Sequence, residues 1–99
     1  MFCVIYRWRL KEGRENDFID AWRQLTLAIR EQRGGLGSRL HRAEDGSWIA
    51  YAQWPDRAAW EASGARPSAE PAASAAMAET IAERFEPTLL EPVADLLVR

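Results

Sequence analysis

The 99-residue sequence contains a single cysteine, Cys3, and a single histidine, His41. One cysteine cannot form an internal disulfide, and this usage is typical of a protein in a reducing compartment. A zinc or iron centre needs three or four converging nitrogen, sulfur or carboxylate ligands, and one imidazole with one thiol does not supply them. We therefore expect no metal site.

Long apolar runs, a phosphate-binding loop and an excess of positive charge are also missing. No run is long enough to cross a membrane, and the first residues lack the apolar core and cleavage site of a signal peptide. The glycine-rich segment 34–37 follows a predicted helix instead of opening one, so it is not a phosphate loop. A formal net charge of −2 gives no sign of nucleic-acid binding. We expect a cytoplasmic protein with a single domain at 1–99.

The sequence does hold an alternation of strand and helix patterns. Period-two alternation and strand-forming composition predict four strands, at 2–10, 36–42, 48–54 and 93–99. Apolar stripes at helical spacing and capping signals predict helices at 14–33, 57–63 and 72–84. The order βαββαβ predicts an α+β, ferredoxin-like domain with a four-stranded antiparallel sheet and the helices on one face.

The pairing of the second and third strands depends on the turn between them. Asp45-Gly46 is a strong signal for a two-residue turn, which would pair Leu40 with Tyr51. Alternation then predicts a helix-facing side with Leu36, Ser38, Leu40, Ile49 and Tyr51. It predicts an opposite side with Arg39, His41, Trp48, Ala50, Ala52 and Trp54.

The candidate substrate-binding residues are those predicted to lie between the sheet and the long helix. They are Tyr6, Trp22, Ser38 and Tyr51. Aromatic rings stack on flat ligands, and hydroxyl groups in an apolar space need a partner, which a ligand can supply. The alternative is that the aromatic side chains only fill the core and the interface. We assign no catalytic residue from the sequence.

A single sheet with helices on one side leaves its other face bare. An exposed face with apolar and basic groups is typical of an interface, so we expect a two-fold homodimer packed sheet against sheet. The predicted interface residues are Arg7, Arg39, His41, Trp48 and Trp54. Histidine is the usual side chain for acid–base chemistry at physiological pH, so a catalytic role of His41 is the alternative to its interface role.

Four segments resemble the antibiotic biosynthesis monooxygenase family of dimeric α/β barrels. They are IYRWRLKEGRENDF at 5–18, Trp22, the Gly34-Gly35-Leu36 step, and YAQWPDRAAWEA at 51–62. The resemblance covers most of 1–62. It implies that the ferredoxin-like domain forms a dimeric α/β barrel with a cavity between sheet and helices.

The resemblance also implies a chemistry. Some members of the family oxidise polycyclic phenols with O2 and without metal or flavin, so we expect a cofactor-independent monooxygenase acting on a small phenol or quinol. The haem-degrading relatives use an Asn, a Trp and a His, and the nearest positions here hold Tyr6, Ser63 and Ala73, so no haem is expected. The alternative function is a non-catalytic homodimer that binds a small aromatic ligand.

Overall fold

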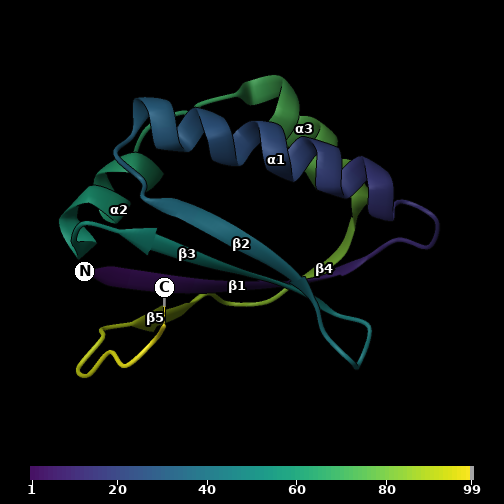
Figure 1. Ribbon diagram of the computed structural model, residues 1–99. Coiled ribbons are helices and arrows are strands. Elements are labelled where there is room, and N and C mark those ends of the chain that lie inside the picture. The colour runs from purple at the N-terminus through teal and green to yellow at the C-terminus, as the bar shows by residue number, and fades with distance from the viewer. Residues whose placement is uncertain (99) are drawn as a thin grey trace.

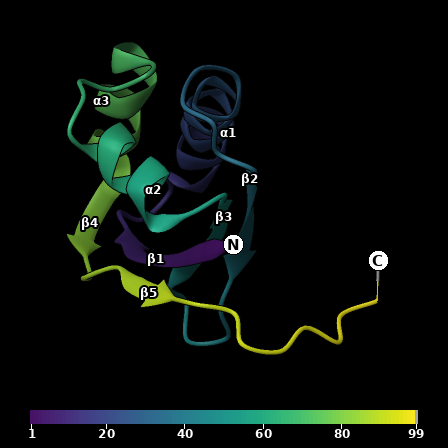
Figure 2. The same ribbon diagram turned by 90° about the vertical axis from the view of Figure 1, so that its left-hand side faces the viewer.

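The structure is a computed structural model that describes residues 1–98. Over this range the chain runs β1 (Phe2–Leu10), α1 (Glu15–Gln32), β2 (Gly37–Arg42), β3 (Trp48–Trp54), α2 (Arg57–Gly64), α3 (Pro71–Thr80), β4 (Ile81–Arg84) and β5 (Thr88–Leu90). The antiparallel sheet has the order β2-β3-β1-β4, and β5 also pairs with β1. All three helices cover one face of the sheet (Figures 1 and 2). The predicted ferredoxin-like α+β order is confirmed, with one additional short strand.

Helix α1 crosses the sheet and supplies the centre of the core. Its first turn carries Glu15 and Asp17, whose charges favour the N-terminal end of a helix. Phe18 is fully buried, with its ring centroid 5.2 Å from that of Trp8 and 5.9 Å from that of Trp48. Gly34 follows the helix at a φ of 76°, the left-handed conformation that ends many helices. The predicted helix at 14–33 is therefore confirmed to within one residue at each end. No helix among residues 1–98 is long and apolar enough to span a bilayer.

The turn between β2 and β3 holds Glu44, Asp45 and Gly46, one residue more than predicted. The amide of Ala43 donates to the Ser47 carbonyl at 2.8 Å, and the amide of Gly46 donates to the Ala43 carbonyl at 3.0 Å. The Asp45 carboxylate accepts hydrogen bonds from the Ser47 amide at 2.9 Å and the Ser47 hydroxyl at 2.6 Å. Gly46 has a φ of 86°, so the turn still needs its glycine.

The longer turn shifts the pairing of β2 with β3 by one residue. Leu40 pairs with Ala50, and His41 pairs with Ile49. The predicted pairing of Leu40 with Tyr51 is wrong. A shift of one residue turns every side chain of a strand to the other face of the sheet, so the predicted faces of β3 are exchanged.

Both tryptophans of β3 consequently face the helices. Trp48 lies opposite Trp8, and Trp54 lies opposite Phe2, on the helix-facing side of β1. Their exposed fractions are 6% and 5%. The prediction that Trp48 and Trp54 lie on the bare face is wrong, and Ile49 and Tyr51 lie there instead.

The predicted helix at 72–84 ends early, at Thr80. Ile81 has an extended backbone, and the Thr80 carbonyl accepts a hydrogen bond from the Lys11 amide at 2.8 Å. Pairing with the free edge of β1 thus outweighs the helical propensity of the next four residues, which form β4.

The predicted strand at 93–99 is also wrong over its described part. Residues 93–98 form no strand and are exposed, while residue 99 lies outside the described range. The last strand is β5, at Thr88–Leu90. With β3 on one edge of β1 and β4 and β5 on the other, β1 has no free edge for the segment that follows.

Candidate functional site

A cavity of about 400 Å³ lies between the sheet and α1, and we call it the inner cavity. It is lined by Tyr6, Trp8, Trp22, Leu25, Thr26, Ile29, Arg30, Gly35, Gly37, Ser38, Ala50, Ala52, Trp54, Met77, Arg84, Phe85 and Pro87. Ala50 and Ala52 place only methyl groups on the central strand β3, which leaves space below α1. The volume lies within the range of small-ligand sites, and most of the lining is apolar.

Three of the four predicted substrate-binding residues line the inner cavity. They are Tyr6, Trp22 and Ser38. Tyr51 lies on the opposite face of the sheet, so the prediction that it faces the same space is wrong, because of the shifted pairing of β3. The binding role of the other three stays a prediction.

Tyr6, in the wall of the inner cavity, is held by a hydrogen bond and a ring contact. Its hydroxyl accepts a 2.9 Å hydrogen bond from Nε1 of Trp60, and its ring stacks on Trp8 at 5.9 Å. Helix α2 positions Trp60, and Asp56 caps this helix by accepting from the amide of Ala59 at 2.8 Å. Burial raises the pKa of Tyr6, and the hydrogen bond from Trp60 opposes this effect. The hydroxyl is therefore protonated at neutral pH, and its own proton is available to a ligand.

Arginine supplies the charge of the inner cavity. Arg30 and Arg84 both line it, whereas Asp, Glu and His are absent from its lining within residues 1–98. The stem of Arg30 lies over Gly37, where an added Cβ would be 3.8 Å from Cδ of Arg30. The arrangement can stabilise an anion, but it offers no carboxylate or imidazole as a general base.

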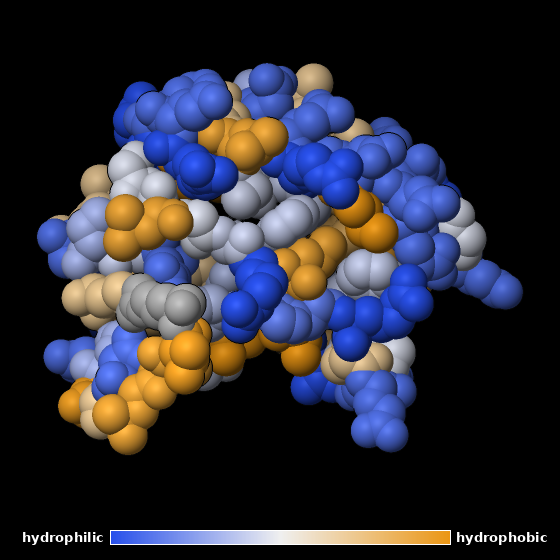
Figure 3. Space-filling view, in the orientation of Figure 1, coloured by the Kyte–Doolittle hydropathy of each residue, from blue (hydrophilic) through white to orange (hydrophobic). Residues whose placement is uncertain are grey.

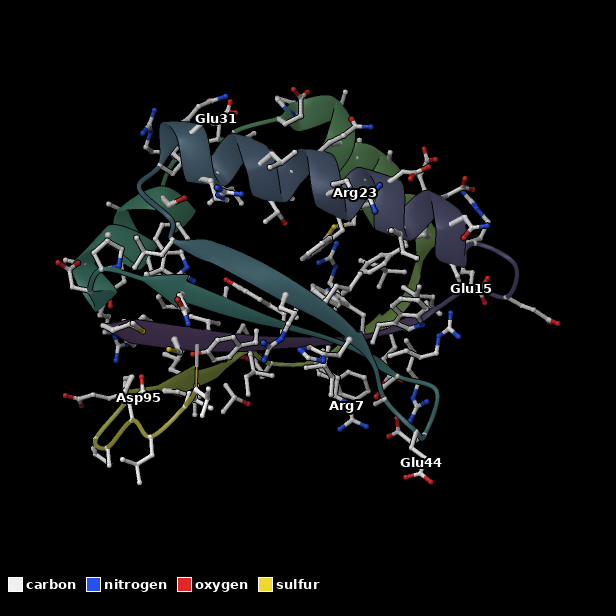
Figure 4. All side chains as sticks on the ribbon, viewed as in Figure 1. Arg7, Glu15, Arg23, Glu31, Glu44 and Asp95 are labelled. Carbon is white, nitrogen blue, oxygen red and sulfur yellow. The ribbon has the colours of Figure 1, made fainter. Side chains whose placement is uncertain are left out.

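A second hollow of about 500 Å³ follows the outer edge of β2, and we call it the outer groove (Figure 3). It is lined by Trp22, Arg23, Thr26, Leu27, Arg30, Leu36, Gly37, Ser38, Arg39, Tyr51 and Gln53. Figure 4 shows Arg23 on the side of α1 that lies above β2. Five residues line both the groove and the inner cavity, namely Trp22, Thr26, Arg30, Gly37 and Ser38. The two hollows therefore adjoin each other along α1 and the start of β2.

The bare face of the sheet carries three of the predicted interface residues. Arg7, labelled in Figure 4 below the sheet, makes a 2.8 Å ion pair with Asp45, and its guanidinium lies 4.9 Å from the centre of the Phe85 ring. Arg39 donates from Nε to Nε2 of His41 at 3.0 Å. These contacts are all within one chain, and the interface role of Arg7, Arg39 and His41 stays a prediction.

Tyr51 also lies on this face, close to Cys3. The Tyr51 hydroxyl and the Cys3 sulfur share a 3.1 Å hydrogen bond, and Nε2 of Gln53 donates to the same hydroxyl at 3.3 Å. The hydrogen bond with Cys3 raises the pKa of Tyr51. The thiol is buried against the sheet, so it serves as a small apolar group with one polar contact.

The sequence-based interpretation missed Arg30 and Arg84. Arg30 could have been found, because Trp22, Thr26 and Arg30 are spaced four residues apart and share one side of a helix. Arg84 could not, because 81–84 was predicted to be helical, and only pairing with β1 turns this side chain toward the inner cavity.

The antibiotic biosynthesis monooxygenase family model matches residues 1–75. The fold is similar to that of SnoaB, a cofactor-independent oxygenase from Streptomyces nogalater, with a TM-score of 0.79 and 20% identity over 96% of this chain and 95% of that one. It is also similar to that of Rv0793 from Mycobacterium tuberculosis, with a TM-score of 0.75 and 16% identity over 97% and 98% of the two chains.

These identities are low, so the two structures show a common fold alone. A search of curated proteins gave no match. The family model, in contrast, extends over most of the chain and includes β1, α1, β2, β3 and α2. The chain therefore belongs to the antibiotic biosynthesis monooxygenase family.

Proposed function

We propose that this protein is a cofactor-independent monooxygenase that oxidises a small aromatic phenol or quinol with O2. The observation that carries the proposal is the inner cavity, an apolar space of about 400 Å³ with a tyrosine hydroxyl and two arginines in its walls. Such a space fits a flat aromatic ligand. SnoaB, which has the same fold, is a cofactor-independent oxygenase, and this likeness supports the proposal.

In this proposal the substrate itself supplies the electrons. The anion of a hydroxyanthrone, for example, transfers electrons to O2, and the ring methylene becomes a carbonyl. One oxygen atom of O2 enters the product and the other leaves as water, so CH2 and O2 give C=O and H2O. The protein's part is to hold the anion in a space with little water, where hydrogen-bond donors act strongly. Tyr6 is the group that would stabilise the anionic oxygen.

The lining has no carboxylate or imidazole within the described range, so no side chain there takes the substrate proton. The substrate would bind as an anion or lose its proton to water. The rate would then rise with pH through the pKa of the substrate, and a suitable substrate is one that ionises readily.

The proposal includes a cytoplasmic homodimer joined through the bare face of the sheet. Arg7, Arg39 and His41 would contribute to this interface, together with Ile5 and Ile49, which lie on the same face. A second sheet packed there would close the dimeric α/β barrel. The buried Trp48 and Trp54 have no part in this interface.

Oxygen uptake with 1,8-dihydroxyanthrone tests the proposed activity. The protein should accelerate oxygen consumption and formation of the dihydroxyanthraquinone above the spontaneous rate in buffer. Ala52→Leu should reduce this acceleration, because a larger side chain fills the inner cavity. Ala62→Leu adds the same atoms at an exposed position of α2 and should retain it, with circular dichroism as the check on folding. Equal rates with and without the protein would contradict the proposal.

The lack of a carboxylate or imidazole in the lining also favours a second function, a non-catalytic module that binds a small aromatic ligand. The same compound separates the two functions. Saturable quenching of tryptophan fluorescence under nitrogen, without accelerated oxygen uptake in air, would indicate the binding module.

A further inference from the structure

We infer that the ligand is a polycyclic aromatic acid whose fused rings lie in the inner cavity, and that Arg30 binds the anionic group at one end of these rings, where the inner cavity meets the outer groove. The inference rests on the proposed function for the place of the ring. It extends that function by naming the class of ligand and the residue that selects it.

The charges around the two hollows differ in sign from the charge of the whole chain. The formal net charge is −2, yet the linings carry Arg23, Arg30, Arg39 and Arg84. Neither lining contains Asp or Glu within residues 1–98. A hollow lined by charges of one sign concentrates ligands of the opposite sign, so this site favours anions.

Arg30 is the arginine of the outer groove that is free to bind an anion. Arg39 is engaged with His41, and its guanidinium lies 5.9 Å from the centre of the Tyr51 ring. Arg23 lies 3.9 Å from the carboxylate of Asp20. Arg30 makes no side-chain hydrogen bond or ion pair with any other part of residues 1–98. A guanidinium in this state can form two parallel hydrogen bonds with one carboxylate.

Arg84 also lines the inner cavity, but the position of Arg30 makes it the better candidate to bind the anionic group. Arg30 borders both hollows, whereas Arg84 borders the inner cavity alone. An anionic group beside Arg30 can therefore remain in the more polar outer groove, which reduces the cost of its desolvation. Arg23 and Arg39 add further positive charge on that side.

The spacing along α1 suits a ligand of fused rings with an acid at one end. Trp22 and Arg30 are two helical turns apart, which corresponds to about 12 Å along the helix axis. This length is comparable to the long axis of three fused rings. Trp22, Thr26 and Arg30 share one side of α1, so a ring beside Trp22 can direct a substituent past Thr26 to the guanidinium.

A pair of matched anthraquinones tests the inference by binding alone. Rhein carries a carboxylate where aloe-emodin carries a neutral hydroxymethyl group on the same dihydroxyanthraquinone rings. We expect rhein to bind at least tenfold more tightly than aloe-emodin at low salt, measured by quenching of tryptophan fluorescence and by calorimetry. The preference should decrease at high salt, because the attraction to an exposed guanidinium is screened.

Three glutamine variants identify the arginine that carries the preference. Arg30→Gln should remove most of the preference for rhein, while Arg84→Gln should preserve it. Arg66→Gln, at an exposed position that lines neither hollow, controls for the loss of one positive charge. Circular dichroism confirms that each variant is folded.

Several results would overturn the inference. They are equal affinities for the two anthraquinones, binding of neither compound, or a preference that survives in Arg30→Gln and is lost in Arg84→Gln. Neither anthraquinone has a ring methylene to oxidise, so the outcome does not depend on oxygenase activity. A preference for rhein that depends on Arg30, without oxygen uptake on hydroxyanthrones, would retain the inference and reject the proposed reaction.

Discussion

Nε1 of Trp60 donates a 2.9 Å hydrogen bond to the hydroxyl of Tyr6 and so connects α2 to the middle of β1. Tyr6→Phe removes the acceptor and leaves the indole N–H without a partner in a partly buried place. We expect the free energy of unfolding to fall by about 1–3 kcal/mol. Urea denaturation measures this change. In a Trp60→Phe background the same substitution should cost less, and an equal cost in both backgrounds would show that the hydrogen bond contributes nothing.

Trp54 is expected to be a major source of stability. Its side chain is 5% exposed and packs with Phe2 and Val4 on the helix-facing side of the sheet. Trp54→Ala should lower the free energy of unfolding by about 3–5 kcal/mol, the usual cost of removing a large buried side chain. Leu36 is 53% exposed, and Leu36→Ala should cost less than about 0.5 kcal/mol. Chemical denaturation measures the loss of stability in each variant. Similar losses in the two variants would contradict the conclusion that buried Trp54 is a major source of stability.

Two glycines should respond to alanine in opposite directions. Gly46 has a φ of 86°, and Gly64 is the last residue of α2. An added Cβ meets no atom within 4 Å at either position, so crowding plays no part. Gly46→Ala should destabilise by about 1–2 kcal/mol because alanine resists the left-handed conformation. Gly64→Ala should stabilise by up to about 1 kcal/mol through helix propensity. Thermal denaturation that moves both midpoints in the same direction would refute this prediction.

Asp45 is expected to make stability depend on pH. The hydrogen bond from the Ser47 hydroxyl is the largest of the effects that lower the pKa of Asp45 below its ordinary value of 3.8. Because the folded protein favours the carboxylate, its stabilising effect is full above that value and disappears as the pH falls through the lowered pKa. Asp45→Asn should therefore be less stable than the wild type at pH 7, and the difference should vanish in stronger acid.

Urea midpoints from pH 2 to pH 7 measure this effect. Glu44→Gln provides the control, because Glu44 is in the same turn and the side-chain hydrogen bonds of Ser47 within residues 1–98 go to Asp45. This variant should follow the wild-type pH dependence. A constant difference between Asp45→Asn and the wild type over the whole range would exclude ionisation of Asp45 as the cause.

A charged side chain at position 49 should weaken the proposed homodimer. Ile49 lies on the bare face, beside Arg7 on the paired strand β1. Sedimentation should show a dimer at micromolar concentration, and Ile49→Glu should raise its dissociation constant at least tenfold because a carboxylate would be desolvated in the interface. Ala62→Glu adds the same charge on α2 and should leave the dimer intact. A folded wild-type monomer at micromolar concentration would refute the homodimer.

The helices and strands near the N-terminus could be predicted because their signals are local. The stripe of Phe18, Trp22, Leu25 and Ile29 is long enough to identify α1. The alternation of apolar residues in β1 correctly predicted that Tyr6 faces the helices. Ser38 was also placed on the correct face. Local periodicity was therefore sufficient for three residues of the inner cavity.

The errors arose where the structure depends on a choice that local sequence leaves open. Gly46 suits a two-residue turn and also the longer turn found, because both need glycine at positive φ. That one-residue difference decided the faces of Trp48, Trp54 and Tyr51. The four residues of β4 have helix-forming composition, and their strand exists because an edge of β1, more than 70 residues earlier in the chain, is free to pair with them.

The central position of β1 in the sheet has a consequence for folding during synthesis. This strand is made before all of its partners, because β3 ends at Trp54 and the other edge of β1 is covered only by β4 and β5, up to Leu90. Until then the nascent chain carries a largely apolar strand with unpaired backbone groups, which can pair with other chains. The sheet therefore closes late in translation, and nascent chains that stall before β4 is made should be prone to aggregation.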